Sequence, residues 1–200
     1  MTHRPVDLSR MRLITVSGRI ASGSTTLAHH LAATLGWRHI EGGEIFWEAV
    51  RRKMHLSEKD TNKRPDEEDR DFDESLKNIL KTQSHLIVET KLAGFNAQGL
   101  EGIFKILVVC QDMHGVDQTN IRIDRLVNRE HISIEEAKEE VLEREKNDLE
   151  KWQRLYANNN TRWVYWDERY YDLIINTYSH DQDQTLHTAL SAIGFKNTVS

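Results

Sequence analysis

The chain has 200 residues, with 27 Lys and Arg against 32 Asp and Glu, which leaves a formal charge of −5. This length is typical of one domain, and 38% hydrophobic residues suffice for a core, so wholesale disorder is excluded. One Cys excludes a disulfide framework and a cysteine-based zinc cluster, and the mild acidity argues against bulk nucleic-acid binding by charge. No apolar run approaches the roughly 20 residues of a membrane span, and no secretory signal opens the chain, so we expect a cytoplasmic protein with no nucleic-acid or membrane partner.

In the first part of the chain, a short apolar run is followed by a segment whose apolar residues recur at helical spacing. Residues 13–17 (LITVS) form a β-branched run that ends at Gly18, which predicts a buried strand. Residues 24–35 carry apolar side chains at helical spacing, and Gly36 follows as a C-cap. The acidic run at 65–69 is interpreted as a solvated face. The other expected elements are a weak strand at 37–41, a helix at 44–54, a loop at 55–70 and a helix at 72–82.

The rest of the chain continues this alternation. Short apolar runs predict three more buried strands, at 86–89, 106–110 and 173–175. A helix predicted at 134–156 opens with a capping box formed by Ser133 and Glu136. Two further helices are expected, at 116–129 and 181–192. Strands that alternate with helices favour βαβ units, and therefore a parallel sheet that helices cover on both faces.

One stretch carries recognisable chemistry. Between the first strand and the first helix the chain reads Gly18-Arg19-Ile20-Ala21-Ser22-Gly23-Ser24-Thr25. The two glycines have the spacing of a phosphate-binding loop, in which a curled backbone points its N–H groups at an anion. The helix N-terminus adds its positive end, and Thr25 stands where a hydroxyl ligates Mg²⁺. The alternative interpretation is a glycine-rich turn that binds nothing.

The loop lacks its usual lysine, because Ser24 stands in that position. A phosphate can still be bound by the backbone amides, but the point charge that follows the transferring phosphoryl group is missing. By analogy with oxyanion-hole donors, such a loss costs about 3–4 kcal/mol of activation free energy. We expect a replacement cation, and the two candidates are Arg19 within the loop and Lys91 after the third strand.

Further blocks follow the loop in a fixed order, and together they carry a family resemblance. They are Glu41 to Phe46 (EGGEIF), Ile87 to Gly94 (IVETKLAG), Arg122 to Glu130 (RIDRLVNRE), Ile132 to Ala137 (ISIEEA), Glu143 to Glu145 (ERE) and Tyr171 to Thr177 (YDLIINT). In these blocks, from about residue 12 to residue 177, the chain resembles the cytidylate kinase-like branch of the nucleoside monophosphate kinases, especially the archaeal-type cytidylate kinases.

The resemblance implies an α/β P-loop NTPase fold with a five-stranded parallel sheet. It also implies a single kinase domain with three parts: a core at about 12–40, 84–125 and 170–195, a nucleoside monophosphate-binding segment at about 41–83, and a lid at about 126–160. The implied activity is transfer of the γ-phosphoryl group of ATP to CMP or dCMP with Mg²⁺. Phosphoryl transfer needs positioned cations around the phosphate oxygens, which arginine provides in bidentate geometry.

The same resemblance assigns the site residues. It implies a nucleotide loop made of Gly18, Arg19, Ser22, Gly23, Ser24, Thr25 and Thr26. It implies catalytic cations at Lys91, Arg125, Arg129 and Arg144, and a metal site at Thr25 and Glu89, the latter possibly through water. It places the acceptor against Glu44, Trp47, Arg51, Arg70, Lys91 and Gly94. Arg122 and Arg154 belong to the same basic set, and for Arg154 a solvated helix face is the favoured interpretation.

Three departures from the family pattern leave alternatives open. Ser24 replaces the loop lysine, Trp47 replaces an expected arginine, and Thr90-Lys91 replaces Gly-Arg. The chain is therefore a (d)CMP kinase, a weakly active or inactive nucleotide-binding protein, or a P-loop kinase of another small molecule.

Two other groups of residues are given structural interpretations. The ten His form no metal-binding motif, and Cys110 ends an apolar strand as a small core residue. An aromatic cluster follows the expected lid, and packing over the sheet edge or an interface is favoured over base stacking. It comprises Trp163, Tyr165, Trp166, Tyr170 and Tyr171.

Overall fold

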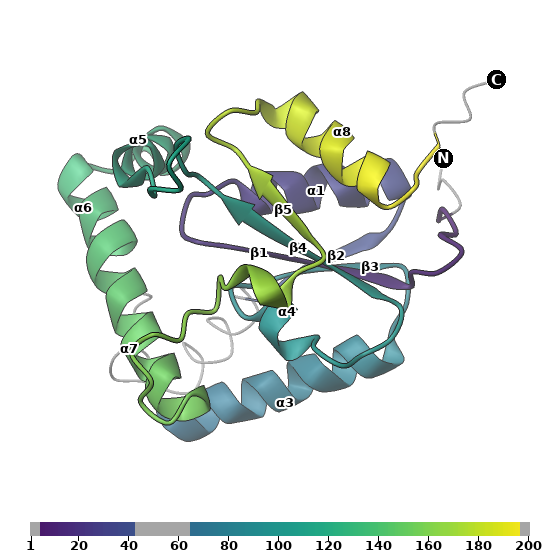
Figure 1. The fold of residues 1–200 in the computed structure, drawn as a ribbon, viewed down its shortest axis with the longest axis horizontal. Helices are drawn as coiled ribbons and strands as arrows, with labels where there is room; N and C mark the ends of the chain where they lie inside the picture. Colours follow the sequence, from purple (N-terminus) through teal and green to yellow (C-terminus); the bar gives the residue numbers. More distant parts are fainter. Residues whose placement is uncertain (1–4, 43–64, 197–200) are drawn as a thin grey trace.

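The computed structural model describes residues 5–42 and 65–196, and its centre is a five-stranded sheet (Figure 1). All neighbouring strands are parallel, in the order β2-β3-β1-β4-β5. The strands are β1 (Leu13–Gly18), β2 (Arg38–Glu41), β3 (Leu86–Glu89), β4 (Ile103–Val109) and β5 (Leu173–Asn176). The predicted parallel α/β sheet is therefore confirmed, and each predicted strand coincides with an observed one.

Helices cover both faces of the sheet, as the sequence predicts. On one face lie α1 (Ser24–Leu35) and α8 (Gln182–Ala192), and on the other lie α3 (Asp66–Thr82) and the short α4 (Ala93–Asn96) (Figure 1). At one side, α5 (Thr119–Glu130), α6 (Ile134–Lys138) and α7 (Glu145–Tyr156) follow one another. None of the helices in the described part of the chain is long and apolar enough to span a membrane.

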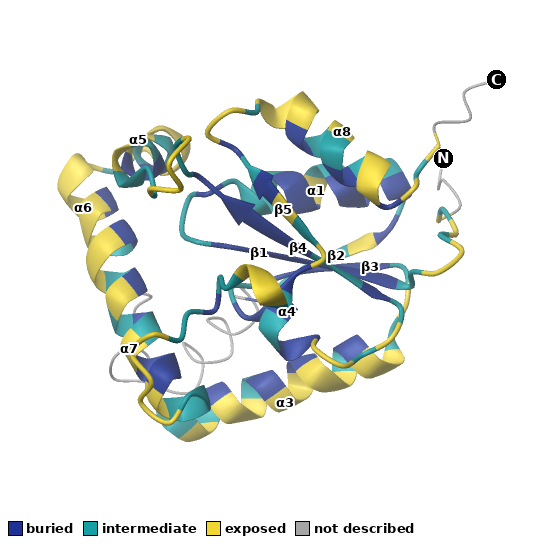
Figure 2. Cartoon of the chain, in the orientation of Figure 1, coloured by how far each residue is buried: buried dark blue, intermediate teal, exposed yellow. Residues whose placement is uncertain are grey.

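The alternation of side chains along β1 builds a core on each face. Ile14 and Val16 are fully buried against α1 and α8, whereas Leu13 is buried against α3 and α4. Successive strand side chains point to opposite faces, so a central strand covered on both sides is apolar almost throughout. Figure 2 shows the resulting dark core along the central strands, with exposed residues on the outer faces of the helices, in the loops and on the outer strands.

Helix α3 begins earlier than predicted. Its first residue is Asp66, so residues 66–70 are helical instead of lying in a loop. Four acidic residues stand in its first turn, where they interact favourably with the positive end of the helix dipole. The interpretation of this acidic run as a solvated face is wrong at Asp69, which is 6% exposed. The helix predicted at 44–54 lies outside the described residues.

The helix predicted at 134–156 forms, but in three parts. The capping box is confirmed, since Glu136 N donates to Ser133 Oγ over 3.2 Å and Ser133 N donates to Glu136 Oε2 over 3.0 Å. Between α6 and α7 the backbone is π-helical over Glu139–Arg144. A π-helical turn holds more residues than an α-helical one, so it changes which side chains of the following helix face the core, and such turns are frequent at functional sites.

Candidate active site

The predicted phosphate loop adopts a curled backbone between β1 and α1. Gly23 has a φ of 107° and Ala21 a φ of 59°, both in the left-handed region. A side chain at Gly18 would clash with Ser22 Oγ and would lie 2.9 Å from the carbonyl oxygen of Val108. Because the turn leaves no room at Gly18 and requires a positive φ at Gly23, both glycines are needed to bring the loop onto the N-terminus of α1.

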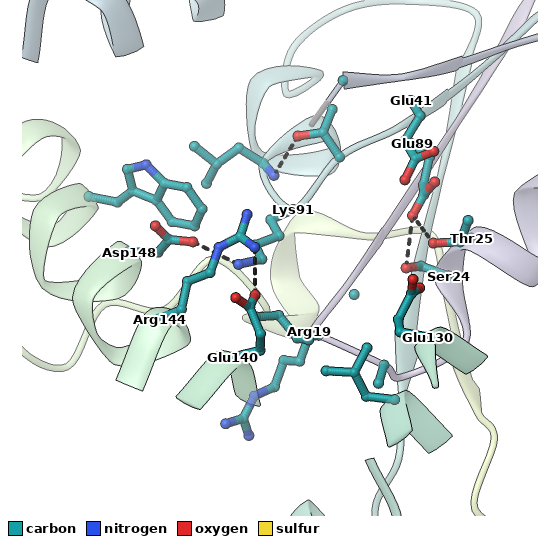
Figure 3. Close-up of a pocket in the computed structure, with 18 of the residues that line it drawn as sticks. Arg19, Ser24, Thr25, Glu41, Glu89, Lys91, Glu130, Glu140, Arg144 and Asp148 are labelled. Atoms are coloured by element: carbon teal, nitrogen blue, oxygen red, sulfur yellow. Dashed lines mark hydrogen bonds and ion pairs between the residues drawn. The ribbon is translucent and has the colours of Figure 1, made fainter. Parts of the chain in front are cut away.

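A cavity of about 600 Å³ opens beside this loop, at the carboxyl ends of β1, β2 and β3. Ligands of open α/β sheets bind at that edge. Helices α3, α5, α6 and α7 contribute the remaining walls. Figure 3 shows residues from the loop, the strand ends and the helices pointing into the same space. Eight of the predicted site residues line the cavity: Gly18, Arg19, Ser24, Thr25, Glu89, Lys91, Arg129 and Arg144.

Two hydroxyls and a carboxylate form the part of the cavity where the sequence predicts a metal. Ser24 Oγ and Thr25 Oγ1 both donate to Glu89 Oε1, over 3.1 and 2.8 Å (Figure 3). The buried second oxygen of Glu89 makes no hydrogen bond and lies 3.6 Å from His39 Nε2. Hydroxyl and carboxylate oxygens are the ligands that Mg²⁺ prefers, so Thr25 and Glu89 suit this ion. No group of three or more His, Cys, Asp or Glu suited to a metal occurs among the described residues, so most of the coordination shell would come from phosphate and water.

Every basic side chain of the described cavity wall is paired with a carboxylate. Lys91 Nζ lies 2.7 Å from Asp148 Oδ2, and Arg144 Nη1 lies 2.6 Å from Glu140 Oε2 (Figure 3). Arg129, half exposed, pairs with its neighbour Glu130 at 2.7 Å. A phosphate that enters the cavity therefore competes with these carboxylates for the cations.

Arg19 points away from the centre of the cavity. Its guanidinium pairs with Glu145 and Asp117 and lies 4.5 Å from the ring centre of Trp166. Burial alone would lower the pKa of Arg19, but the charge and hydrogen bond of Glu145 and the charge of Asp117 raise it overall. Lys91 is thus the better placed of the two expected replacements for the missing loop lysine.

Three predicted residues do not line the cavity but lie in or beside the loop. Gly23 and Thr26 belong to the start of α1, and Ser22 is buried under the loop, where its carbonyl accepts a hydrogen bond from Thr177 Oγ1 at 2.7 Å. Arg125, predicted to be catalytic, instead donates to Thr177 Oγ1 and to the Thr177 carbonyl, each over 2.8 Å. Its guanidinium therefore joins the end of β5 to the back of the loop.

Of the three predicted acceptor residues that the structure describes, one lines the cavity. Arg70 lies exposed on α3, and Gly94 is buried where a side chain would clash with the ring of Tyr171. Neither residue lines the cavity, whereas Lys91 does. The other three, Glu44, Trp47 and Arg51, lie outside the described residues.

Arg122, a member of the predicted phosphate-binding set, is fully buried and paired with Asp117 and Glu145. The structure therefore contradicts a direct contact between Arg122 and phosphate. Arg154 is half exposed and pairs with Asp66 across the surface, which agrees with its favoured interpretation as part of a solvated helix face.

Sequence reasoning missed several acidic and aromatic residues of the cavity. Asp148 and Trp152 of α7 follow Arg144, the last residue of the π-helical turn, at intervals of four, and all three line the cavity. This spacing was available in the sequence. Asp69 and Asp73 of α3 also line the cavity, and burial raises the pKa of Asp73 despite the hydrogen bonds of Tyr156 and Asn96. Nothing in the sequence around these two signals that they face the site.

The aromatic cluster is internal packing. Tyr165 is fully buried against Leu92 and Trp152, and its pKa is raised well above the ordinary value because burial disfavours the phenolate. Tyr171 packs on Leu107 and Val109 of β4. These contacts contradict base stacking for both tyrosines and also exclude them from an interface.

The sheet order, the curled loop on a helix N-terminus and the cavity beside it define a P-loop phosphotransferase. A family model described as an AAA domain matches residues 17–161. A cytidylate kinase of Haloarcula marismortui is 32% identical over 90% of this chain and 88% of its own, and that of Methanopyrus kandleri is 31% identical over 90% and 92%. This chain belongs to the cytidylate kinase family.

Solved structures with low sequence identity share the fold. A shikimate kinase from Bacteroides thetaiotaomicron matches 92% of this chain and 99% of its own, with a TM-score of 0.58 and 13% identity. An uncharacterized protein from Eubacterium ventriosum matches 93% of this chain and 100% of its own, with a TM-score of 0.63 and 14% identity. These matches support the P-loop kinase architecture.

Proposed function

We propose that the protein transfers the γ-phosphoryl group of ATP to CMP or dCMP with Mg²⁺. The observation that carries this proposal is the single cavity in which the phosphate loop, Lys91 and Arg144 meet, in a chain that belongs to the cytidylate kinase family. Phosphoryl transfer depends on positioning and on charge stabilisation, and this cavity offers loop amides for the donor and side-chain cations for the transferred group.

The charge of the cavity supports a metal-bound donor. Four basic and eight acidic side chains line it, so a bare triphosphate would meet an excess of negative charge. Thr25 and Glu89 are the residues that would hold Mg²⁺. When bound, this ion neutralises the phosphate oxygens and orients them for in-line transfer. The residues of the chain then position the two substrates and exclude water.

In this proposal Lys91 replaces the missing loop lysine and supplies the positive charge beside the transferring phosphoryl group. It follows β3, the strand next to β1, and its ammonium is 20% exposed in the cavity wall. Before phosphate binds, the Lys91 ammonium is paired with Asp148. The segment from about 126 to 160 is the lid, and Arg144 and Arg129 are its phosphate-facing cations. The segment from about 41 to 83 receives the acceptor.

A coupled assay with ATP and Mg²⁺ over CMP, dCMP, UMP, AMP and GMP tests the proposal. We expect turnover, with CMP or dCMP as the best acceptor. Replacement of Lys91 by Met should lower kcat by about a hundredfold or more, as for the loss of one oxyanion-hole donor. Lys105→Met is the matched control, because Lys105 has the same exposure and also pairs with an aspartate, Asp172, but does not line the cavity.

Absence of turnover with every acceptor, in well-folded protein, would refute the kinase proposal. The departure at Ser24 favours one alternative, a nucleotide-binding protein without catalysis. In that case ATP binds measurably, and Ser24→Lys is needed to create activity. If Ser24→Lys lowers an existing activity, the alternative is rejected. A kinase of another small molecule would show turnover only outside the nucleotide set.

A further inference from the structure

Four charged side chains form one cluster, of which two are buried and two are partly buried. Arg19 comes from the phosphate loop, Asp117 from the segment just before α5, Arg122 from the first turn of α5 and Glu145 from the start of α7. Arg122 is fully buried and Glu145 is 3% exposed. Arg122 contacts both acids, at 2.9 Å from Asp117 and 3.1 Å from Glu145, and Arg19 contacts both as well. Two positive and two negative charges therefore balance.

The cluster binds one residue of the phosphate loop, Ile20, through both of its backbone polar groups. Ile20 N donates to Glu145 Oε2 over 3.1 Å, and Arg122 Nη1 donates to the Ile20 carbonyl oxygen over 2.7 Å. The carboxylate and the guanidinium are themselves bonded to each other. Ile20 is thus fixed from outside the loop, by residues 102 and 125 positions away in sequence.

The neighbouring residue makes the contact more rigid. The guanidinium of Arg19 donates to Glu145 through Nε, over 2.8 Å, and lies over the ring of Trp166. Glu145 therefore receives hydrogen bonds from the backbone of Ile20 and from two guanidinium groups. This set of donors from three different residues fixes the position of the Glu145 carboxylate.

The π-helical turn explains how one helix serves two sites. The turn ends at Arg144, and α7 begins at Glu145. Arg144 faces the cavity, whereas the next residue faces the back of the phosphate loop. The helical segment that lines the cavity is thus bonded to the phosphate loop at the junction where the π-helical turn ends and α7 begins.

We propose that Glu145 is a positioning residue, which with Arg122 fixes the backbone of Ile20 on both sides of its Cα, so that the phosphate loop is shaped for the donor's phosphates before the nucleotide arrives. The inference rests on the proposed function in its choice of ligand, a nucleoside triphosphate. Preorganised amides bind and stabilise phosphate without a reorganisation cost. Loss of these hydrogen bonds to the Ile20 backbone should weaken binding of the donor nucleotide and leave binding of the acceptor unchanged.

The test compares Glu145→Gln with Glu150→Gln. Glutamine keeps the size and an acceptor oxygen at residue 145 but removes the charge, and Glu150 is an exposed glutamate of the same helix. We expect Glu145→Gln to raise the donor KM, and the Kd of a non-hydrolysable ATP analogue, by about tenfold to a hundredfold. The acceptor KM should stay within about twofold, and Glu150→Gln should behave as wild type.

Hydrogen exchange of the Ile20 amide supplies a readout independent of turnover. In the ligand-free wild type this amide should be protected, and Glu145→Gln should accelerate its exchange by about tenfold or more. Exchange at the unprotected rate in folded wild type overturns the proposal, even if Glu145→Gln fails to fold. Equal changes in donor and acceptor KM also overturn it. If no acceptor is turned over but analogue binding and Ile20 protection change together, the kinase proposal fails and the role of Glu145 stands.

Discussion

At the scale of single residues, Tyr171 leaves no room for a side chain at position 94. A Cβ at Gly94 would overlap the tyrosine ring, and the Gly94 amide donates to Ser17 Oγ over 3.1 Å at the end of β1. The glycine therefore allows α4 to approach the sheet. This is a packing role, in contrast to the acceptor contact that the family resemblance implied.

Gly94→Ala should lower the free energy of unfolding by about 1–3 kcal/mol, the usual cost of overpacking a core. Urea denaturation measures it, and KM for both substrates should stay within about twofold in the folded enzyme. Gly99→Ala is the control, because it has open space but a φ of 73°, so it should cost only about 1 kcal/mol of backbone strain. If Gly94→Ala instead raised the acceptor KM alone, Gly94 would be assigned to the acceptor site.

Local signals made the start of the site predictable. Gly18, Gly23 and Thr25 are close in sequence, and the backbone geometry that they require depends on their own residue types. The partners of Lys91 and Arg19 were not predictable, because each of these two pairs joins distant segments. Lys91 meets Asp148 57 residues on, and Arg19 meets Glu145 126 residues on. Which carboxylate lies beside which cationic side chain is determined by the tertiary fold.

At the scale of elements, α7 is held along one face. Glu145, Asp148 and Lys151 follow one another at intervals of three, and all three are buried. They contact in turn Arg19 of the phosphate loop, Lys91 just beyond β3 and Asp69 of helix α3. A polar helix face normally points to solvent, so the sequence alone favours the wrong orientation for these residues. These residues face the interior because each of them pairs there with a residue of opposite charge.

Helix ends were easier to predict, and α8 shows why. Asp181 accepts a hydrogen bond from Gln184 N over 2.8 Å, and the side chain of Gln184 accepts from Asp181 N over 3.0 Å. Both partners lie within four residues, so the reciprocal cap depends on local sequence alone. The helix was predicted from 181, and the structure starts it at Gln182 with Asp181 as N-cap.

Removal of this cap should destabilise the protein modestly. Asp181→Ala leaves the first amides of α8 without an acceptor and should lower the free energy of unfolding by about 1 kcal/mol. Thermal and urea unfolding measure the change. Asp183→Ala is the matched control, since this exposed aspartate lies in the same first turn but is not the N-cap. Equal losses in the two variants would show that helix-dipole charge, and not the cap, stabilises α8.

At the scale of the whole molecule, ion pairs connect α7 to α3. Lys151 Nζ lies 2.5 Å from Asp69 Oδ2, with both side chains 7% exposed, while Arg154 Nη2 lies 2.7 Å from Asp66 Oδ1 on the surface. With Glu145 at its other end, α7 thus connects the phosphate loop to the helix that leads out of the segment proposed to receive the acceptor.

The buried pair should contribute far more than the exposed one. Lys151→Met removes the cation that lies against the buried Asp69 carboxylate and should lower the free energy of unfolding by about 3–5 kcal/mol, whereas Arg154→Met should cost less than about 1 kcal/mol because water screens its pair. The double variant Lys151→Met/Asp69→Leu should recover most of the loss, since an apolar pair of similar volume replaces the buried ions at little cost. Urea denaturation of the four proteins tests this, and similar losses for Lys151→Met and Arg154→Met would contradict it. If the double variant is stable but its kcat falls, the ion pair also sets the spacing between donor and acceptor.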